Sequence, residues 1–337
     1  MKLPAHAFTL AAGAAGLAAL VALVAHEGYG TILETLGRAG WGLLWIVPFH
    51  ALPLMLDAEG WRALLRPRDP QGVATRPFLL WVAAVREAVS RLLPVASIGG
   101  EIVGIRLVLL RPLDGAAVAA SVIVEVLLTL VNQILFTALG LALLLTIIKK
   151  TPLVDTLVAG LAASAAAPVA LALLLRYGSP FTRLALLVER MLGERYGLTT
   201  LTGGAAALDE EVLQLCRRYG RLWTALAWQL AGMVVGAFET WFVLRLFGHP
   251  TTVWNAIALE SLCLAIRNLV FFVPGALGVQ ETGLVLIGGL IGLPADVAIA
   301  LSLAKRFREI AVGLPALASW QWVEIGRIRR KLGESAR

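Results

Sequence analysis

The sequence predicts an all-α polytopic membrane protein with about six full spans and two re-entrant broken-helix hairpins, related as an inverted-topology repeat. Hydrophobic residues make up 59% of the chain and charged residues only 15%, a balance that is too apolar for a soluble domain. Long apolar runs recur along all 337 residues, and basic residues gather between the runs. Two of the runs are interrupted by the same pattern of proline, glycine and glutamate. We therefore treat residues 1–337 as a single integral membrane domain.

The first two spans are expected at residues 7–25 and 41–56. Lys2 precedes the first apolar run, as in cleavable signal peptides, but a further span follows directly, so we expect residues 7–25 to remain uncleaved. The next connection is rich in arginine, and the basic bias of inner loops places it in the cytoplasm. Its basic residues are Arg62, Arg66, Arg68 and Arg76.

Residues 78–110 form the first broken element. A helix is expected to end at Pro94, which lacks a backbone donor, and a second helix resumes at Glu101. The two pieces are about 24 and 15 Å long, and each is shorter than a hydrocarbon core of about 30 Å. A hairpin that enters and leaves from the cytoplasmic side is the simplest arrangement.

The middle of the chain is expected to contain two full spans and a long connection. Residues 115–148 are apolar but include Glu125, which should face a protein interior rather than lipid. A further span is expected at residues 152–175. The arginine-rich connection at residues 176–222 is placed in the cytoplasm, and its amphipathic part is either a helix in the membrane interface or a solvated connector.

The last third repeats the plan of the first broken element. A span at residues 223–246 leads to an uncharged turn at residues 248–250, which we place outside. The second broken element, residues 254–293, is interrupted at Pro274 and enters from the outer face. A final span at residues 295–320 returns to a basic tail, so both termini are expected in the cytoplasm.

The two interruptions are separated by a constant offset. Glu101 follows Pro94 by seven residues, Glu281 follows Pro274 by seven residues, and the two copies lie 180 residues apart. The distribution of basic residues predicts that the first broken element enters the membrane from the inner face and the second from the outer face, as inverted-topology transporters require. The repeat halves are residues 78–148 and 254–320.

Glu101 and Glu281 are the leading candidate site residues, because a carboxylate at membrane depth suggests a functional site. Each is expected in the first turn of a half-helix, where the positive end of the helix dipole stabilises an anion. Entry from opposite faces would bring the two carboxylates together near the midplane. The alternative is that each glutamate only caps its own half-helix.

Further candidates lie beside these glutamates. The charged run at residues 305–309 lies inside the last span, and Glu309 can pair along its own helix with Lys305 or Arg306. The 180-residue offset makes Lys305 equivalent to Glu125. Arg267, just before the second interruption, either contacts a polar headgroup or neutralises a neighbour. The candidate transport residues are Glu101, Glu281, Pro94, Pro274, Arg267, Arg306, Glu309 and Glu125.

Motifs of other function classes are not found in the sequence. The four histidines are far apart and form no metal-binding spacing, and no nucleophile elbow, phosphate loop or dinucleotide fingerprint occurs. Cys216 and Cys263 are interpreted as ordinary small residues. We expect no metal, no cofactor and no nucleic-acid partner, since the net charge of +7 follows from the loop arginines.

These motifs resemble those of the flippase-like membrane family that includes the transmembrane region of lysylphosphatidylglycerol synthases. Within it, the chain is most similar to hopanoid-biosynthesis-associated membrane proteins, and the similarity covers nearly the whole chain. The matching residues are Leu93-Pro94, Gly99-Gly100-Glu101, Val273-Pro274-Gly275-Ala276-Leu277-Gly278-Val279-Gln280-Glu281, Lys305-Arg306-Phe307-Arg308-Glu309, His50-Ala51-Leu52-Pro53-Leu54, Asp57 and Trp61-Arg62. Ser90-Arg91 depart from the asparagines that the family often has there.

The resemblance implies a protein of the bacterial inner membrane that helps to move hopanoids toward the outer membrane. Lysyl transfer is not expected, because no soluble aminoacyl-transferring segment is found. The expected partners are the membrane and a lipid substrate, with the oligomeric state open. The alternative is an intramembrane lipid-modifying enzyme that uses Glu101 or Glu281 as a general base.

The predicted orientation can be tested by labelling single cysteines in intact cells, in a background that lacks Cys216 and Cys263. A membrane-impermeant reagent should modify a cysteine placed at Pro250 and spare cysteines at Arg68, Arg195 and Arg330, because the last three lie in predicted inner segments. Strong labelling at position 195 from outside would contradict both the orientation and the inverted repeat.

Overall fold

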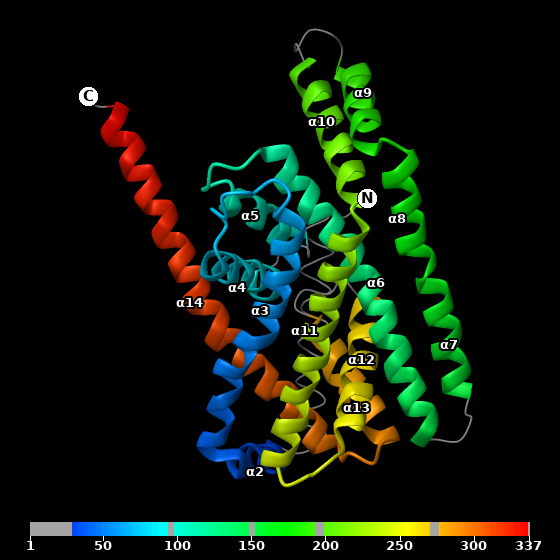
Figure 1. Cartoon of the computed structure of the whole chain (residues 1–337). Helices are drawn as coiled ribbons and strands as arrows, with labels where there is room; N and C mark the ends of the chain where they lie inside the picture. Colours follow the sequence, from blue (N-terminus) through cyan, green and yellow to red (C-terminus); the bar gives the residue numbers. More distant parts are fainter. Residues whose placement is uncertain (1–28, 94–97, 148–151, 193–198, 270–275, 336–337) are drawn as a thin grey trace, which may run out of the picture. The chain divides into compact units, whose positions relative to one another are not determined.

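The computed structural model describes residues 29–93, 98–147, 152–192, 199–269 and 276–335, and every regular element in these ranges is a helix (Figure 1). The prediction of an all-α polytopic membrane protein is therefore confirmed. The expected first span at residues 7–25 lies outside the described residues, as do Pro94 and Pro274. The helices are α2 (Tyr29–Ala39), the 3-10 helix η1 (Gly40–Trp45), α3 (Ile46–Leu65), α4 (Arg76–Leu92), α5 (Ile98–Val108), α6 (Gly115–Ile147), α7 (Pro152–Ser164), α8 (Ala166–Tyr177), α9 (Pro180–Leu192), α10 (Thr199–Cys216), α11 (Tyr219–Leu246), α12 (Val253–Leu269), α13 (Val279–Leu290) and α14 (Ala295–Ser335).

Four stretches of described helix are long and apolar enough to cross a membrane: Gly30–Leu65, Gly115–Thr146, Val158–Tyr177 and Tyr219–Leu246. They correspond to the spans expected from the second to the fifth. The expected final span became α14, which is 41 residues long and carries the charged run at residues 305–309 in its first half. Its charged residues, not its length, distinguish it from the four apolar helices.

The chain divides into two compact units. Unit 1 comprises Met1–Ala51, Leu80–Gly104 and Ala237–Arg337, and unit 2 comprises Leu52–Leu79 and Ile105–Gly236. Helices α3, α4, α5 and α11 contribute residues to both units. Each unit is described separately below.

Unit 2 is built around α6, which contacts α7, α8 and α10, while α9 lies beside α10 (Figure 1). Its core contains Leu64, Val124, Val212 and other apolar side chains from α3, α6 and α10. One buried hydrogen bond joins two of these helices. Trp61 Nε1 donates to Ser121 Oγ at 2.9 Å, a contact that ties α3 to α6.

Unit 1 contains the second broken element. Helix α12 contacts α13, α13 contacts α14, and α14 contacts α2. The backbone turns before α13, where Ala276 and Gly278 adopt φ values of 48° and 73°. Glycine reaches this left-handed region without steric penalty, so Gly278 suits the turn, whereas Ala276 is strained. Because α13 starts at Val279, Glu281 lies in its first turn, as the sequence predicted.

The helix starts recur along the chain with an offset of about 180 residues. Helices α4, α5 and α6 begin at Arg76, Ile98 and Gly115, and α12, α13 and α14 begin at Val253, Val279 and Ala295. In each set, two helices shorter than a span precede a long helix. This recurrence is what an internal repeat requires, and the inverted relation of the halves stays a prediction.

Candidate functional site

The most buried charge in unit 1 belongs to Glu281. Its side chain is fully buried, and Oε1 accepts a hydrogen bond of 2.8 Å from Ser302 Oγ. Arg306 lies against the same oxygen, with Nη2 at 3.4 Å. The second carboxylate oxygen, Oε2, has no hydrogen-bond partner among the described residues. A buried ionised group requires such partners, so one acceptor position of Glu281 remains available to a donor.

Polar contacts continue from Glu281 across the turn between α12 and α13. Gln280 Nε2 donates to Ser302 Oγ at 3.1 Å, and Gln280 Oε1 accepts from Arg267 Nη1 at 3.2 Å. Three helices are therefore joined at this point: α12 through Arg267, α13 through Gln280 and Glu281, and α14 through Ser302. The start of the half-helix is held by side chains on both neighbouring helices.

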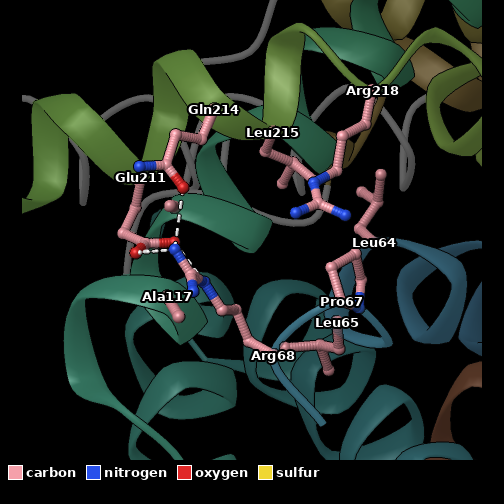
Figure 2. A pocket seen from close by; sticks show the side chains of 10 residues that line it. Leu64, Leu65, Pro67, Arg68, Ala117, Glu211, Gln214, Leu215 and Arg218 are labelled. Carbon is pink, nitrogen blue, oxygen red and sulfur yellow. Dashed lines mark hydrogen bonds and ion pairs between the residues drawn. The ribbon is translucent and has the colours of Figure 1, made fainter. Parts of the chain in front are cut away.

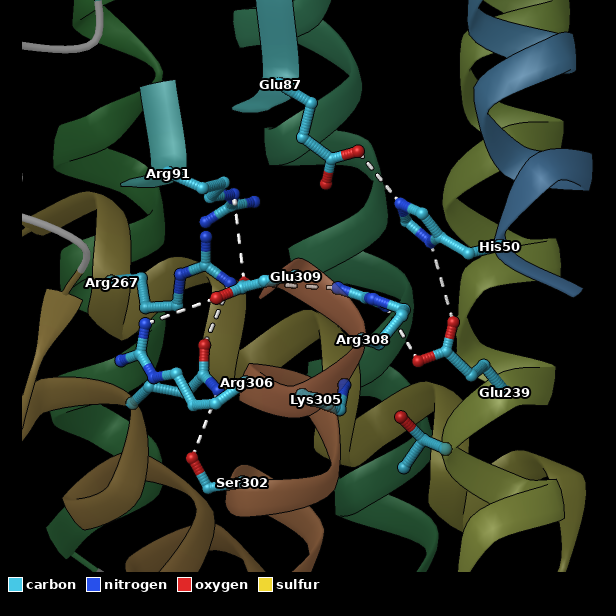
Figure 3. Close-up of polar contacts among 12 residues, drawn as sticks. His50, Glu87, Arg91, Glu239, Arg267, Ser302, Lys305, Arg306, Arg308 and Glu309 are labelled. Atoms are coloured by element: carbon cyan, nitrogen blue, oxygen red, sulfur yellow. Dashed lines mark hydrogen bonds and ion pairs between the residues drawn. The ribbon is translucent and has the colours of Figure 1, made fainter. Parts of the chain in front are cut away.

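On the other side of Arg306, the contacts run along α14 and onto α11. Arg306 Nη1 lies 3.3 Å from Glu309 Oε2, the pairing along the helix that the spacing allowed. Arg308 Nη2 and Arg91 Nε are 3.9 and 4.0 Å from Glu309 Oε1. Arg308 Nη1 makes a closer pair, at 2.7 Å, with Oε1 of Glu239 on α11 (Figure 3).

The chain of contacts ends at a histidine between two carboxylates. His50 Nε2 lies 2.8 Å from Glu87 Oε2 on α4. Its other ring nitrogen, Nδ1, is 3.5 Å from Glu239 Oε2, and neither of these two atoms has a hydrogen-bond partner among the described residues (Figure 3). We call the whole set of side chains the charge network. Its members are His50, Glu87, Arg91, Glu239, Arg267, Gln280, Glu281, Ser302, Arg306, Arg308 and Glu309.

Two further ion pairs of unit 1 involve the broken elements. Lys305 pairs with Glu260 of α12, and Thr240 Oγ1 donates to the same Glu260 oxygen at 2.7 Å. Arg86 of α4 pairs with Glu101 of α5. Both carboxylates are more exposed than Glu281, at 25% and 28% of their side-chain surface. These two pairs therefore lie nearer to solvent than the centre of the charge network.

Glycine allows α5 to approach α4 closely at the Arg86 pair. A Cβ atom at Gly104 would lie 2.5 Å from Arg86 Cδ, and one at Gly100 would lie 2.6 Å from the Arg86 carbonyl oxygen. The two glycines thus provide room for the Arg86 side chain as it reaches Glu101. This is the close helix packing that small residues permit.

Of the predicted site residues, the structure brings four into the charge network: Arg267, Glu281, Arg306 and Glu309. Glu101 lies in the first turn of α5 as expected, but its partner is Arg86. The expected approach of Glu101 to Glu281 stays a prediction. Of the two residues that the repeat made equivalent, Lys305 pairs with Glu260 in unit 1, and Glu125 is buried in unit 2. Pro94 and Pro274 lie outside the described residues.

Sequence reasoning missed His50, Glu239, Glu260 and the role of Arg308. Glu239 and Glu260 carried a usable signal, because each is a carboxylate within a predicted apolar helix. His50 carried no such signal. Its partners are 37 and 189 residues away in sequence, and only folding brings them to the ring.

A second polar cluster lies in unit 2 and is weaker. Arg68 makes a two-pronged pair with Glu211, with distances of 2.9 and 2.5 Å, and also donates to Gln214 at 2.8 Å (Figure 2). The Arg68 side chain is 45% exposed, and exposed pairs contribute only about 0–1 kcal/mol. We therefore regard this cluster as a surface contact between the loop after α3 and α10.

The described residues contain no group of three or more histidine, cysteine or acidic side chains that could hold a metal ion. Both cysteines are free. Burial raises the pKa of the Cys216 thiol, which lies outside the candidate spans. A thiol with a raised pKa is a poor nucleophile, in agreement with its interpretation as an ordinary small residue.

Taken together, the apolar helices and the buried ion pairs define a multi-pass α-helical membrane protein with a charged interior. A family model described as the lysylphosphatidylglycerol synthase TM region matches residues 8–316, and the chain belongs to this family. The predicted family relation is thereby confirmed. Comparison with curated proteins and with solved structures found no match.

The buried pair between Arg308 and Glu239 should be important for stability. Replacing Arg308 by Met leaves the Glu239 carboxylate buried without its cation, which costs about 3–5 kcal/mol in comparable buried pairs. We expect a clearly lower melting temperature in detergent micelles. The double variant Arg308→Met with Glu239→Gln should recover most of the loss, because no charge is then left unpaired.

The matched control is Arg38→Met, which removes the exposed pair with Glu34 on α2. Exposed pairs contribute about 0–1 kcal/mol, so this variant should melt near the parent. Equal effects of the two single variants would show that the Arg308 pair is not buried in the folded protein.

Proposed function

We propose that the protein moves a polar lipid across the membrane, acting as a flippase-like lipid transporter. The observation that carries the proposal is the charge network of unit 1, which gathers buried and half-buried carboxylates and arginines from α4, α11, α12, α13 and α14. Charged groups at membrane depth are expensive and are usually associated with a substrate or ion pathway. The family description names a region of lipid synthases, which supports a lipid as the substrate.

The physical task of such a transporter is to carry a polar headgroup through hydrocarbon. An unpaired hydroxyl loses roughly 4–8 kcal/mol on transfer from water to an alkane-like medium. The Oε2 atom of Glu281 can accept a hydrogen bond from such a group, and the first turn of α13 supplies amides that a headgroup oxygen can use. A site of this kind replaces the hydrogen bonds that the headgroup loses on leaving water.

The repeated helix pattern supports the same class of function. Broken helices in corresponding positions of two halves are typical of transport sites near the middle of a membrane. Helices α4 and α12 are 17 residues long, and α5 and α13 are 11 and 12 residues long. At 1.5 Å per residue the longest is about 26 Å, below the roughly 30 Å that a full span needs.

The proposed lipid is a hopanoid, and the proposed direction is from the bacterial inner membrane toward the outer membrane, with both termini of the chain in the cytoplasm. This part rests on the sequence motifs shared with hopanoid-biosynthesis-associated proteins. The polyhydroxylated end of such a lipid donates hydrogen bonds, which fits an acceptor-bearing site. Glu101 with Arg86, and Glu281 with Arg306, are the proposed contacts at the two ends of the path.

A second candidate function is an intramembrane lipid-modifying enzyme. It is favoured by one observation, the unpaired Oε2 of Glu281, since a general base needs a free acceptor within reach of its substrate. The two functions differ in what a deletion strain loses. Loss of a transporter leaves every lipid species present but misplaced, whereas loss of an enzyme removes a species.

The test is complementation of a deletion strain, followed by mass spectrometry of lipids from separated inner and outer membranes. Glu281→Ala and Glu101→Ala should insert normally yet fail to restore outer-membrane hopanoid, because the headgroup loses its charged contacts. The Gln variants keep size and hydrogen bonding and should be intermediate. Glu34→Ala, an exposed glutamate of α2, is the matched control and should behave as the parent.

Parental transport by well-expressed Ala variants at both positions would mean that these glutamates are only helix caps. The site would then be sought at Arg267 and Arg306. A missing lipid species in the deletion strain, in place of a misplaced one, would support the enzyme.

A further inference from the structure

The end of the charge network at His50 has the geometry of a proton-binding site. The imidazole is held between carboxylates from two other helices, Glu87 on α4 and Glu239 on α11. His50 and Glu239 are buried, at 8% and 1% of their surface. A histidine with two acidic neighbours can hold either one or two protons, so its surroundings decide which form is stable.

The hydrogen-bond geometry identifies where the second proton would bind. An ionised Glu87 only accepts, so the 2.8 Å contact places a proton on Nε2. In neutral imidazole, Nδ1 is then an acceptor that faces another acceptor, Glu239 Oε2, at 3.5 Å, and neither atom has a partner among the described residues. A proton on Nδ1 converts this unfavourable contact into a charge-assisted hydrogen bond.

The charges around His50 favour the same step. The groups that face it come from three helices: Glu87 and Arg91 of α4, Glu239 of α11, and Arg308 and Glu309 of α14. The two groups nearest to the ring, Glu87 and Glu239, are both carboxylates, and opposite charges this close favour a protonated ring. Arg308 opposes the step, but it is itself paired with Glu239.

A small cavity beside His50 can hold a proton carrier. It is lined by His50, Glu87, Arg91 and Glu309, together with small and apolar side chains of α4 and α14. Its room for water is about that of one molecule, and its walls offer several polar partners. Water at this position would exchange protons with the imidazole.

We propose that His50 takes up and releases a proton in each transport cycle, so that lipid movement is coupled to protons. This rests on the proposed function. On uptake, a proton from water binds Nδ1, and the new imidazolium donates to Glu239 Oε2. Glu239 then shares its charge between His50 and Arg308, which weakens its pair with Arg308. On release, the proton returns to cavity water.

The ion pairs between His50 and Glu281 connect proton uptake to the proposed lipid contact. Arg308 lies 3.9 Å from Glu309 Oε1, Arg306 lies 3.3 Å from Glu309 Oε2, and Arg306 also faces Glu281. Strengthening or weakening one pair changes the charge that its neighbour must balance. Protonation at His50 therefore biases the pairing of Glu281 with Arg306, the contact that a lipid headgroup would exchange.

The proton site can be tested by ¹⁵N NMR of the histidine-labelled protein in nanodiscs. The nanodiscs are made from a lipid other than the proposed substrate. The chain has four histidines, and His50→Gln identifies the His50 signal by its loss. We expect the His50 ring to change between its singly and doubly protonated forms within the pH range over which the protein stays folded. Glu239→Gln should make the ring lose its second proton at lower pH. A ring that keeps one form across this range would overturn the proposal.

Coupling is tested in the deletion strain with the fractionated lipid readout. His50→Gln should lower outer-membrane hopanoid to the level of the empty vector while the protein is inserted and folded, and His249→Gln, in the turn after α11, should behave as the parent. Parental transport by His50→Gln would overturn proton coupling and leave lipid transport intact. If the parent gene itself fails to restore lipid distribution, the proposed function fails, and the NMR titration still decides on the proton site.

Discussion

The structure of unit 1 depends on the free energy of placing charges away from water. An isolated ionised carboxylate in hydrocarbon is prohibitively unfavourable, so such groups must be paired and hydrogen-bonded. Every carboxylate of the charge network has a basic neighbour, and consecutive pairs share members. The packing of α11, α12, α13 and α14 must therefore bring each of these charges to its partner. Replacing a buried ion pair by apolar residues of similar volume is often no less stable, so stability alone does not account for these charges.

The two ends of the network have complementary chemistry. At one end, Glu281 is fixed by Ser302 and Arg306 but keeps one acceptor unpaired. At the other end, His50 Nδ1 and Glu239 Oε2 face each other at 3.5 Å, and neither has a hydrogen-bond partner among the described residues. Between the two ends, Arg308 pairs closely with Glu239, at 2.7 Å, whereas Glu309 lies 3.3 Å from Arg306 and 3.9 Å from Arg308. The longer pairs around Glu309 rearrange more readily than the close one. In a network of this kind, the protonation of one group can change the ion pairing of another.

Much of the fold was predictable, because apolar runs and prolines determine locally where helices form and where they end. The interruption before Glu281 predicted a new half-helix, and α13 begins two residues before that glutamate. The long helix at residues 115–148 was found almost unchanged as α6. The helix that begins with the expected last span continues beyond residue 320 to Ser335, so the basic tail is helical as far as that residue.

The site was predictable only in part, because the partner of each charged side chain depends on which helices pack against each other. Charge at membrane depth singled out Glu281, Arg306 and Glu309, and the same argument applied to every span would have included Glu239. Spacing could not pair Lys305 with Glu260, or place His50 between its two carboxylates, since these contacts join distant segments. The histidines are far apart in sequence, and folding places one of them, His50, between two carboxylates.

Native mass spectrometry of the protein released from mild detergent tests whether the charge network of unit 1 holds the lipid headgroup. The parent should retain a host lipid that resists delipidation, Glu281→Ala should lose it, and Glu211→Ala in the unit 2 surface cluster should retain it. Equal retention of the same lipid by the parent and by Glu281→Ala would show that the network does not hold the headgroup.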